Sequence, residues 1–313
     1  MPRRNGPESK PFEARVSGAG GEAGLNIPEG FVTRCAGRFT LLAREERVED
    51  VLAARVLDER DPRLWKGARE PLGGGRGGIV PLRLGGESPC PVIVKPLLRG
   101  GILRRLNRDI HFSASRLFDE ARLSLLINRR SVPASEMIFG RAERLAGPFF
   151  RLHLATAEIE HATPLLDFIE NGGASEGENA AVLKTAGESV RTLHEAGIYH
   201  ADLNLNNLLV VPRSGGVEVH VIDLDASRIV PTLSERGRSS NLARLLRHAV
   251  KNGLHARFDI LRLGRMFMDG YCGDCDSLHL RNRVMRAFRR TLPLHRVSWR
   301  LQGISVPAVT FGS

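Results

Sequence analysis

Two clusters of polar residues lie at the ends of short apolar runs. The first, HADLNLNN at 200–207, precedes the run LLVV, and the second, DLD at 223–225, follows the run VEVHVI. The turn residues Ser214-Gly215-Gly216 lie between the two runs, so we predict a β-hairpin with both clusters at its ends. A hairpin by itself does not require His, Asp and Asn at these positions. We infer that the two clusters hold a charged group.

The spacing within the first cluster fits the pattern H-x-D-L-x-x-x-N of a kinase catalytic loop. On this interpretation Asp202 accepts the proton of an acceptor hydroxyl or orients that hydroxyl. Asn207 is a ligand of a second Mg²⁺, and Asp223, in the place of the DFG aspartate, holds the principal Mg²⁺. Phosphoryl transfer needs such groups because the migrating group is anionic and its transition state spreads charge.

An earlier part of the chain carries two weaker signals for nucleotide binding. The strand VIVK ends at Lys95, which would pair with nucleotide phosphates and with a helix glutamate, and Glu120 is the natural partner. A loop with the glycine pattern G-x-G-x-x-G precedes this region, and its residues Gly75, Arg76, Gly77 and Gly78 are candidates for contact with phosphate. The loop leads into a strand, as in kinases, whereas a dinucleotide-binding loop leads into a helix. Taken alone, the loop is equally a flexible turn, and Lys95 a solvated strand end.

The order of elements predicts an α+β protein with two lobes and a protein-kinase-like fold. Residues 1–28 read as a disordered leader, 29–159 as a strand-rich N-lobe and 160–313 as a helical C-lobe. Apolar periodicity predicts strands at 79–84, 91–97 and 148–159, and helices at 115–130, 164–172, 179–198, 239–253 and 257–271.

Charge is the strongest feature of the composition. The 313 residues include 46 Lys and Arg against 35 Asp and Glu, a net charge of +11, which favours anionic partners. Nucleic acid is not expected, because no nucleic-acid-binding motif is found and aromatic residues make up only 5%. No apolar run reaches the length of a membrane span and no secretory signal is evident, so we expect a cytoplasmic protein. Cys272 and Cys275 form a CxxC without a second ligand pair and are interpreted as ordinary thiols.

Several segments together resemble the lipopolysaccharide kinase (Kdo/WaaP-like) family. They lie between about residue 61 and residue 271 and include DPRLWKG, VKPLLRGG, FDEARLSLL, GPFFRLHLATAEI, YHADLNLNNLLV, VIDLDASRI, NLARLLR and FMDGY. The resemblance implies a kinase-like fold that uses ATP and Mg²⁺ to phosphorylate a 3-deoxy-D-manno-octulosonic acid (Kdo) sugar on lipid A, at the cytoplasmic face of the inner membrane. It also implies Asp202, Lys95 and Glu120 as catalytic residues and Asn207 and Asp223 as metal ligands. Ala157 and Ile159 are further candidates for contact with the nucleotide.

Departures from protein kinases favour a small or lipid-linked acceptor. Ala201 replaces the Arg of the HRD motif, and Asp225 replaces the Gly of DFG. Only about 13 residues, Ala226 to Arg238, separate DLD from the next predicted helix, which leaves little room for a peptide-binding platform. Alternatives are a kinase of another small molecule, an atypical protein kinase on the same fold, or a nucleotide-binding scaffold without turnover.

The basic segment 281–303 alternates arginines with Phe288, Trp299 and several aliphatic residues. One interpretation is a helix that lies on an anionic membrane. The other is a final helix that packs on the C-lobe with a solvated arginine face.

Overall fold

The computed structural model describes residues 26–70, 78–86, 88–98, 109–171, 176–225, 227–273, 277–302 and 304. They form two compact units. The first contains the described residues up to Arg122 together with Met137–Ala157, and the second contains Leu123–Glu136 and the described residues from Glu158 onward. The sequence predicted one cut near residue 160. The structure differs at Leu123–Glu136 because Leu123, Ile127 and Val132 are buried in the hydrophobic core of the second unit. Most of the predicted leader, 1–25, lies outside the described residues.

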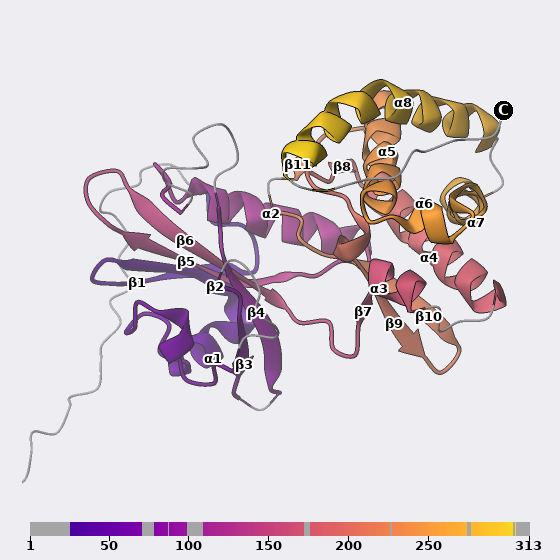
Figure 1. Ribbon diagram of the computed structural model, residues 1–313. Helices are drawn as coiled ribbons and strands as arrows, with labels where there is room; N and C mark the ends of the chain where they lie inside the picture. The colour runs from indigo at the N-terminus through magenta and orange to yellow at the C-terminus, as the bar shows by residue number, and fades with distance from the viewer. Residues whose placement is uncertain are drawn as a thin grey trace, which may run out of the picture. The chain divides into compact units, whose positions relative to one another are not determined.

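A six-stranded antiparallel sheet forms the first unit, with the strand order β1-β2-β5-β6-β4-β3 (Figure 1). Its strands are β1 (Phe31–Ala36), β2 (Phe39–Arg44), β3 (Val80–Leu84), β4 (Cys90–Pro96), β5 (Met137–Arg144) and β6 (Phe150–Ala157). The short segments η1 (Glu45–Arg47), α1 (Val48–Ala53) and η2 (Pro62–Leu64) follow β2, and the helix α2 (Ser115–Arg129) begins in this unit. The strands predicted at 79–84, 91–97 and 148–159 are confirmed.

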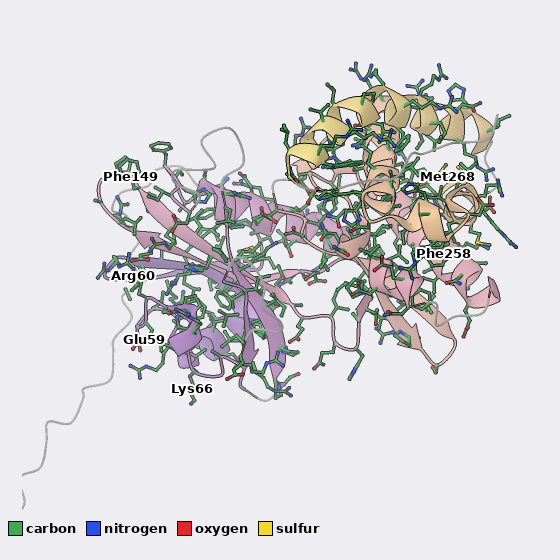
Figure 2. All side chains as sticks on the ribbon, viewed as in Figure 1. Glu59, Arg60, Lys66, Phe149, Phe258 and Met268 are labelled. Atoms are coloured by element: carbon green, nitrogen blue, oxygen red, sulfur yellow. The ribbon has the colours of Figure 1, made fainter. Side chains whose placement is uncertain are left out.

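A buried arginine holds the segment between α1 and η2 against the sheet. Arg141 on β5 is fully buried, and its guanidinium lies 4.9 Å from the ring centre of Phe39 and 4.6 Å from that of Trp65. It donates hydrogen bonds to the backbone carbonyls of Val56, Glu59 and Arg60, the last two of which are labelled in Figure 2. The contact with Trp65 gives DPRLWKG, one of the segments that carry the family resemblance, a structural role in the first unit.

The second unit is mainly helical. Its helices are α3 (Leu165–Glu170), α4 (Glu176–Glu195), α5 (Glu235–Lys251), α6 (Leu254–Arg257), α7 (Ile260–Cys272) and α8 (Ser277–Leu301). Its short strands are β7 (Thr163–Pro164), β8 (Ile198–Tyr199), β9 (Leu208–Arg213), β10 (Gly216–Val221) and β11 (Arg228–Ile229). Strands β9 and β10 pair antiparallel with Leu208 opposite Val221, so the predicted hairpin is confirmed. The α+β class is likewise confirmed, with strands concentrated in the first unit and helices in the second.

The structure of helix α8 bears on both interpretations of the basic segment, because one side of the helix is packed and the other is exposed. Val284, Phe288 and Trp299 are buried in the core of the second unit, so the aromatic residues of this helix serve packing. The opposite side is exposed, and we call it the α8 outer face: it carries Arg286, Arg289, Arg290, Leu294, Val297 and Leu301. No helix within the described part of the chain is long and apolar enough to cross a membrane.

Candidate active site

His200 connects the two polar clusters from inside the second unit. Its side chain is fully buried, and its Nδ1 accepts a hydrogen bond from the backbone N–H of Asp202 at 3.0 Å. Nε2 therefore carries the proton and donates to the carbonyl of Ile222 at 3.0 Å, next to Asp223. Burial lowers the pKa of His200, which agrees with a neutral ring in this arrangement. One imidazole thus fixes the distance between the loop at 200–207 and the DLD segment.

Two asparagine side chains hold the backbone of Asp202. Its carbonyl accepts hydrogen bonds from Nδ2 of Asn207 at 2.9 Å and from Nδ2 of Asn204 at 3.0 Å. Leu203 and Leu205 alternate with these polar residues and are buried in the hydrophobic core. The side chain of Asp202 remains 68% exposed, so its carboxylate is available to a molecule that approaches from solvent.

Asp223 has an unusual backbone conformation for a residue with a side chain. Its φ is +60°, in the left-handed region that disfavours most residues other than Gly, Asn and Asp. The neighbouring Leu224 is buried in the core, and the backbone N–H of Ile222 donates to the carbonyl of Asn207, so the surrounding structure fixes this conformation. Strained backbone that is held in this way is concentrated at functional sites. The side chain of Asp223 is exposed.

Asn207 and Asp223 offer the type of ligand that Mg²⁺ prefers. Because Nδ2 of Asn207 is engaged with the carbonyl of Asp202, Oδ1 is the atom that can bind a cation. Carboxylate and amide oxygens suit Mg²⁺, which is commonly held by one or two carboxylates together with substrate phosphates. Within the residues that the structure describes, no group of three or more His, Cys, Asp or Glu could hold a metal ion. The oxygens of Asn207 and Asp223 are of a type that suits a Mg²⁺ shared with a nucleotide.

The other sequence candidates lie mainly in the first unit. Lys95 is on β4 opposite Leu154, and Glu120 is buried on α2, with Nε of Arg116 3.9 Å from its Oε1. Gly78 precedes β3 with a φ of +70°, and Ala157 ends β6 opposite Val92, whereas Ile159 follows in the second unit. Gly75, Arg76 and Gly77 lie outside the described residues. The second unit brings together Asp202, Asn207 and Asp223.

A chain of buried hydrogen bonds behind His200 was not predicted. Oδ1 of Asn241, on α5, accepts from the backbone N–H of His200 at 3.1 Å and from Nε2 of His194 at 3.1 Å. Nδ2 of Asn241 donates to the carbonyl of His200 at 2.8 Å. Nδ1 of His194 then accepts from the hydroxyl of Tyr271 at 2.8 Å, and Arg238 donates to the same hydroxyl oxygen at 3.3 Å. Burial lowers the pKa of His194 to about 3, so the ring is neutral, as this pattern requires.

The sequence pointed to the segments that contain Asn241 and Tyr271, but it did not predict a role for either residue. Asn241 begins NLARLLR and Tyr271 ends FMDGY, two of the segments on which the family resemblance rests. The structure shows that they support the loop at 200–207 from helices α5 and α7. NLARLLR also supplies Arg244, whose Nη1 lies 3.2 Å from Oδ1 of Asp202.

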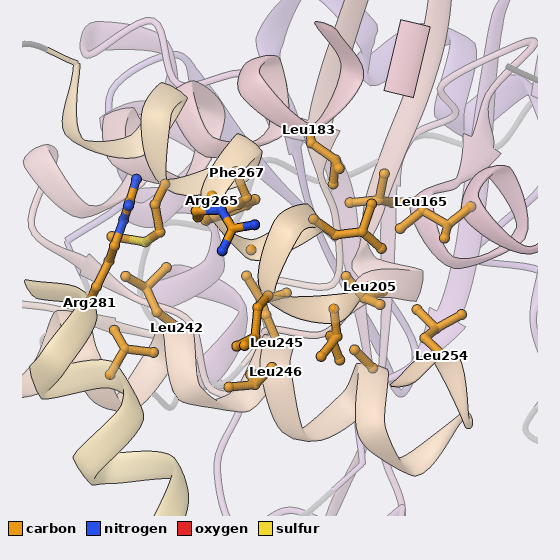
Figure 3. Close-up of a pocket in the computed structure, with 18 of the residues that line it drawn as sticks. Leu165, Leu183, Leu205, Leu242, Leu245, Leu246, Leu254, Arg265, Phe267 and Arg281 are labelled. Atoms are coloured by element: carbon orange, nitrogen blue, oxygen red, sulfur yellow. The ribbon is translucent and has the colours of Figure 1, made fainter. Parts of the chain in front are cut away.

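An apolar cavity of about 330 Å³ lies elsewhere in the second unit (Figure 3). Aliphatic side chains from α3, α4, α5 and α7 line most of it, including Leu165, Leu183 and Leu245, and Leu205 of the loop at 200–207 reaches its wall. Arg265 and Arg281 also lie at its boundary. Because the lining carries few polar groups, the cavity offers nothing for phosphoryl transfer.

Comparison with known proteins gives consistent results. A model of the lipopolysaccharide kinase (Kdo/WaaP) family matches residues 90–267. The 3-deoxy-D-manno-octulosonic acid kinase of Pasteurella multocida (strain Pm70) is 32% identical over 162 residues, which cover 50% of this chain and 65% of that enzyme, just under two thirds. The enzyme of the same name from Xanthomonas euvesicatoria pv. vesicatoria (strain 85-10) is 28% identical over 207 residues, covering 64% of this chain and 77% of that enzyme.

Among solved structures, "WaaP in complex with acyl carrier protein" is 18% identical, with a TM-score of 0.47, and the match covers 71% of this chain and 87% of that one. The family model spans more than half of the chain and includes both polar clusters, Lys95 and Glu120. The chain therefore belongs to the lipopolysaccharide kinase (Kdo/WaaP) family.

Proposed function

We propose that this protein is an ATP-dependent kinase that phosphorylates a hydroxyl of a Kdo sugar in the lipid A-linked inner core of lipopolysaccharide. The exposed carboxylate of Asp202 carries the proposal, because its backbone is fixed by His200, Asn204 and Asn207 while its oxygens stay accessible. The names of the relatives supply the acceptor, and family membership supports the reaction class.

Each candidate residue has a distinct part in this proposal. Asp202 accepts the proton of the acceptor hydroxyl, or orients that hydroxyl toward the γ-phosphate. Asn207 and Asp223 hold Mg²⁺, which neutralises charge on the phosphates when it is bound. Lys95, positioned by Glu120, contacts the phosphates of ATP, and the loop at 75–78 with Ala157 and Ile159 completes the nucleotide contacts.

The buried histidines contribute by position and not by proton transfer. His200 keeps its proton on Nε2 and is linked through Asn241 to His194 and Tyr271. Since burial keeps both rings neutral, they hold the loop without adding positive charge beneath the metal ligands. The acid–base work of the site therefore falls to Asp202.

The product of the reaction tests the proposal. The purified protein is incubated with Kdo-lipid A, Mg²⁺ and ATP labelled at the γ-phosphate, and the lipid and protein fractions are analysed by mass spectrometry. We expect one added phosphate on the Kdo moiety, formed about 10²–10⁴-fold more slowly when Asp202→Asn replaces the parent protein. Label on protein would instead support an atypical protein kinase, and nucleotide binding without turnover on any acceptor would support a scaffold.

We also propose that the protein works at the cytoplasmic face of the inner membrane, with the α8 outer face against anionic lipid. Charge supports this placement, because Arg286, Arg289 and Arg290 are exposed beside Leu294, Val297 and Leu301. Basic residues near an anionic surface each contribute about 1 kcal/mol, and exposed aliphatic side chains can enter the headgroup region.

Vesicle co-sedimentation tests the membrane placement. If the contributions of the three arginines to binding add, replacement of Arg286, Arg289 and Arg290 by Gln weakens binding to anionic vesicles by up to about 3 kcal/mol, or roughly 100-fold. High salt weakens binding of the parent protein in the same way. As a matched control, Arg257, Arg262 and Arg265 near or on α7 are replaced, which removes the same charge from another surface. Equal binding to neutral and anionic vesicles would contradict the proposal.

A further inference from the structure

Helix α5 presents a row of basic side chains that begins at the catalytic loop. Arg244, Arg247, His248 and Lys251 are spaced i, i+3, i+4 and i+7, which places them on one face of the helix. We call this row the α5 basic stripe. Its first member, Arg244, contacts Asp202, with Nη1 3.2 Å from Oδ1.

The stripe carries more positive charge than its contacts neutralise. Arg247 donates from Nη1 to the hydroxyl of Thr291 at 2.9 Å, a neutral acceptor on α8. Burial lowers the pKa of Arg247, and the charge of Arg244 lowers it further, so the two guanidinium groups repel one another. Among ion pairs between described residues, the stripe meets a single carboxylate, that of Asp202. A second anion at this position would reduce the repulsion.

The position of Arg244 brings it within reach of any acceptor that Asp202 serves. An acceptor hydroxyl that is hydrogen-bonded to Asp202 lies within a few ångströms of the guanidinium, because the two side chains are already in contact. A guanidinium has five N–H donors in a planar fork and can bind two carboxylates at once. The side chain of Arg244 is 37% exposed, so part of it faces the solvent from which an acceptor arrives.

We propose that Arg244 determines acceptor specificity by binding the carboxylate of a sugar acid, and thereby places the sugar hydroxyl at Asp202. The inference rests on the proposed function, since Kdo is an ulosonic acid and keeps a free carboxylate when it is linked through its anomeric carbon. Arg247 and Lys251 increase the positive potential at the same place, whereas burial lowers the pKa of His248 and keeps its ring neutral. A neutral sugar offers no partner for this charge.

A comparison of two acceptors with two variants tests the role of Arg244. The acceptors are a water-soluble Kdo glycoside and its methyl ester, which differ only in the charge of the carboxyl group and its small alkyl substituent. For the parent protein we expect kcat/KM to be about 10- to 100-fold higher with the acid, the range for a hydrogen bond to a charged group. Arg244→Gln lowers kcat/KM for the acid by a similar factor and removes most of the preference over the ester.

Two further variants control for charge and folding. Arg213→Gln removes another exposed arginine that pairs with a carboxylate, Glu218 at 2.8 Å, and we expect it to keep the parent preference for the acid. Arg244→Lys retains the charge without the planar fork, so it retains part of the preference. Because all variants are compared on the ratio between two acceptors, a loss of folded protein cancels from the measurement.

Three outcomes would overturn the inference. If Arg244→Gln lowers kcat/KM equally for the acid and the ester, so that the ratio between them is unchanged, Arg244 acts only on Asp202 or on the nucleotide. A parent protein that phosphorylates acid and ester equally well would refute the carboxylate contact while the kinase function stands. A parent protein that phosphorylates neither the glycosides nor Kdo-lipid A would refute the proposed function itself, and this inference with it.

Discussion

Asp202 is fixed through its backbone, while its carboxylate is accessible from solvent. The N–H of Asp202 donates to His200, and its carbonyl accepts from Asn204 and Asn207. The carboxylate contacts Nδ2 of Asn204 at 3.3 Å and Nη1 of Arg244 at 3.2 Å, both near the surface. Since the backbone contacts do not involve the carboxylate, a change confined to that group leaves the loop in place.

Replacement of Asp202 by Asn should therefore separate catalysis from binding. The amide has nearly the same size but cannot accept the acceptor proton, and positioned acid–base groups contribute about 10²–10⁴-fold. We expect kcat to fall by a factor in that range while Mg·ATP binding, measured by calorimetry, remains close to that of the parent. Turnover within a few-fold of the parent would show that Asp202 has another role.

The left-handed backbone of Asp223 makes a different prediction. Both Asp223→Ala and Asp223→Gly remove the carboxylate, so both should lose turnover and bind Mg·ATP more weakly, unlike Asp202→Asn. Glycine adopts a φ of +60° without cost, whereas alanine does not. We expect the glycine variant to be more stable than the alanine variant by about 1 kcal/mol in urea unfolding. Equal stability of the two variants would mean that the backbone relaxes at this position.

The site residues differ in how far the sequence could reveal them. Asp202, Asn207 and Asp223 lie close together in the chain, and their spacing alone predicted a shared role. Asn241 and Arg244 reach the same loop from about 40 residues away, because α5 folds back against it. No local pattern encodes a contact of that kind, so the residues that support Asp202 became visible only in the fold.

At the scale of elements, helices α4 and α7 approach one another through glycine. A methyl group on Gly187 of α4 would collide with the carbonyl of Phe267, and one on Gly270 of α7 would collide with the carbonyl of Lys184. The close approach also brings His194 on α4 within hydrogen-bond distance of Tyr271 on α7. The packing of these two helices is therefore linked to the loop at 200–207 through His194 and Asn241.

Replacement of two glycines of α7 by alanine should change the free energy of unfolding in opposite directions. Gly270→Ala forces α4 and α7 apart, and overpacking of this kind typically costs about 1–3 kcal/mol. Gly264 also lies within α7 but has no atom near the position of an added Cβ, so Gly264→Ala should stabilise by about 1 kcal/mol through helix propensity. Chemical denaturation of both variants measures the difference. A destabilising Gly264→Ala would show that α7 is not helical at this position in solution.

The elements themselves were predictable where apolar residues recur at a clear period. Helices α2, α4, α5 and α7 and strands β3, β4 and β6 were predicted from such patterns. Strands β1, β2 and β5 were not, because FVTRCA, FTLLAR and MIFGRAER mix charged and apolar residues within a few positions. On β5 the reason is Arg141, a charged residue that is buried and satisfied by backbone carbonyls and aromatic rings.

At the scale of the whole molecule, each unit contains a deeply buried histidine. Burial lowers the pKa of His153 in the first unit and of His194 in the second to about 3. In the unfolded chain the same groups titrate near 6.5. Between these values the unfolded state binds more protons than the folded state, so the free energy of unfolding falls as the pH decreases.

Mild acid should therefore destabilise the protein before its carboxylates titrate. Between pH 6.5 and pH 5 each of the two histidines should cost roughly 2 kcal/mol, while aspartate and glutamate side chains in the unfolded chain remain mostly ionised. Urea unfolding across this range measures the slope, and His194→Gln should reduce it although it lowers stability at pH 7. A free energy of unfolding that is constant from pH 5 to pH 7 would contradict burial of these rings.

The apolar cavity of the second unit gives the protein a mechanical property. Hydrostatic pressure favours whichever state occupies the smaller volume, and unfolding eliminates internal voids. The cavity of about 330 Å³ is partly open to solvent, so this unit responds to compression only through the part of that volume that water does not fill. Leu205, between Asp202 and Asn207, forms part of the wall, so a change in the volume of the cavity reaches the loop at 200–207. On the proposed function, moderate pressure would then slow turnover reversibly, at pressures that leave the chain folded.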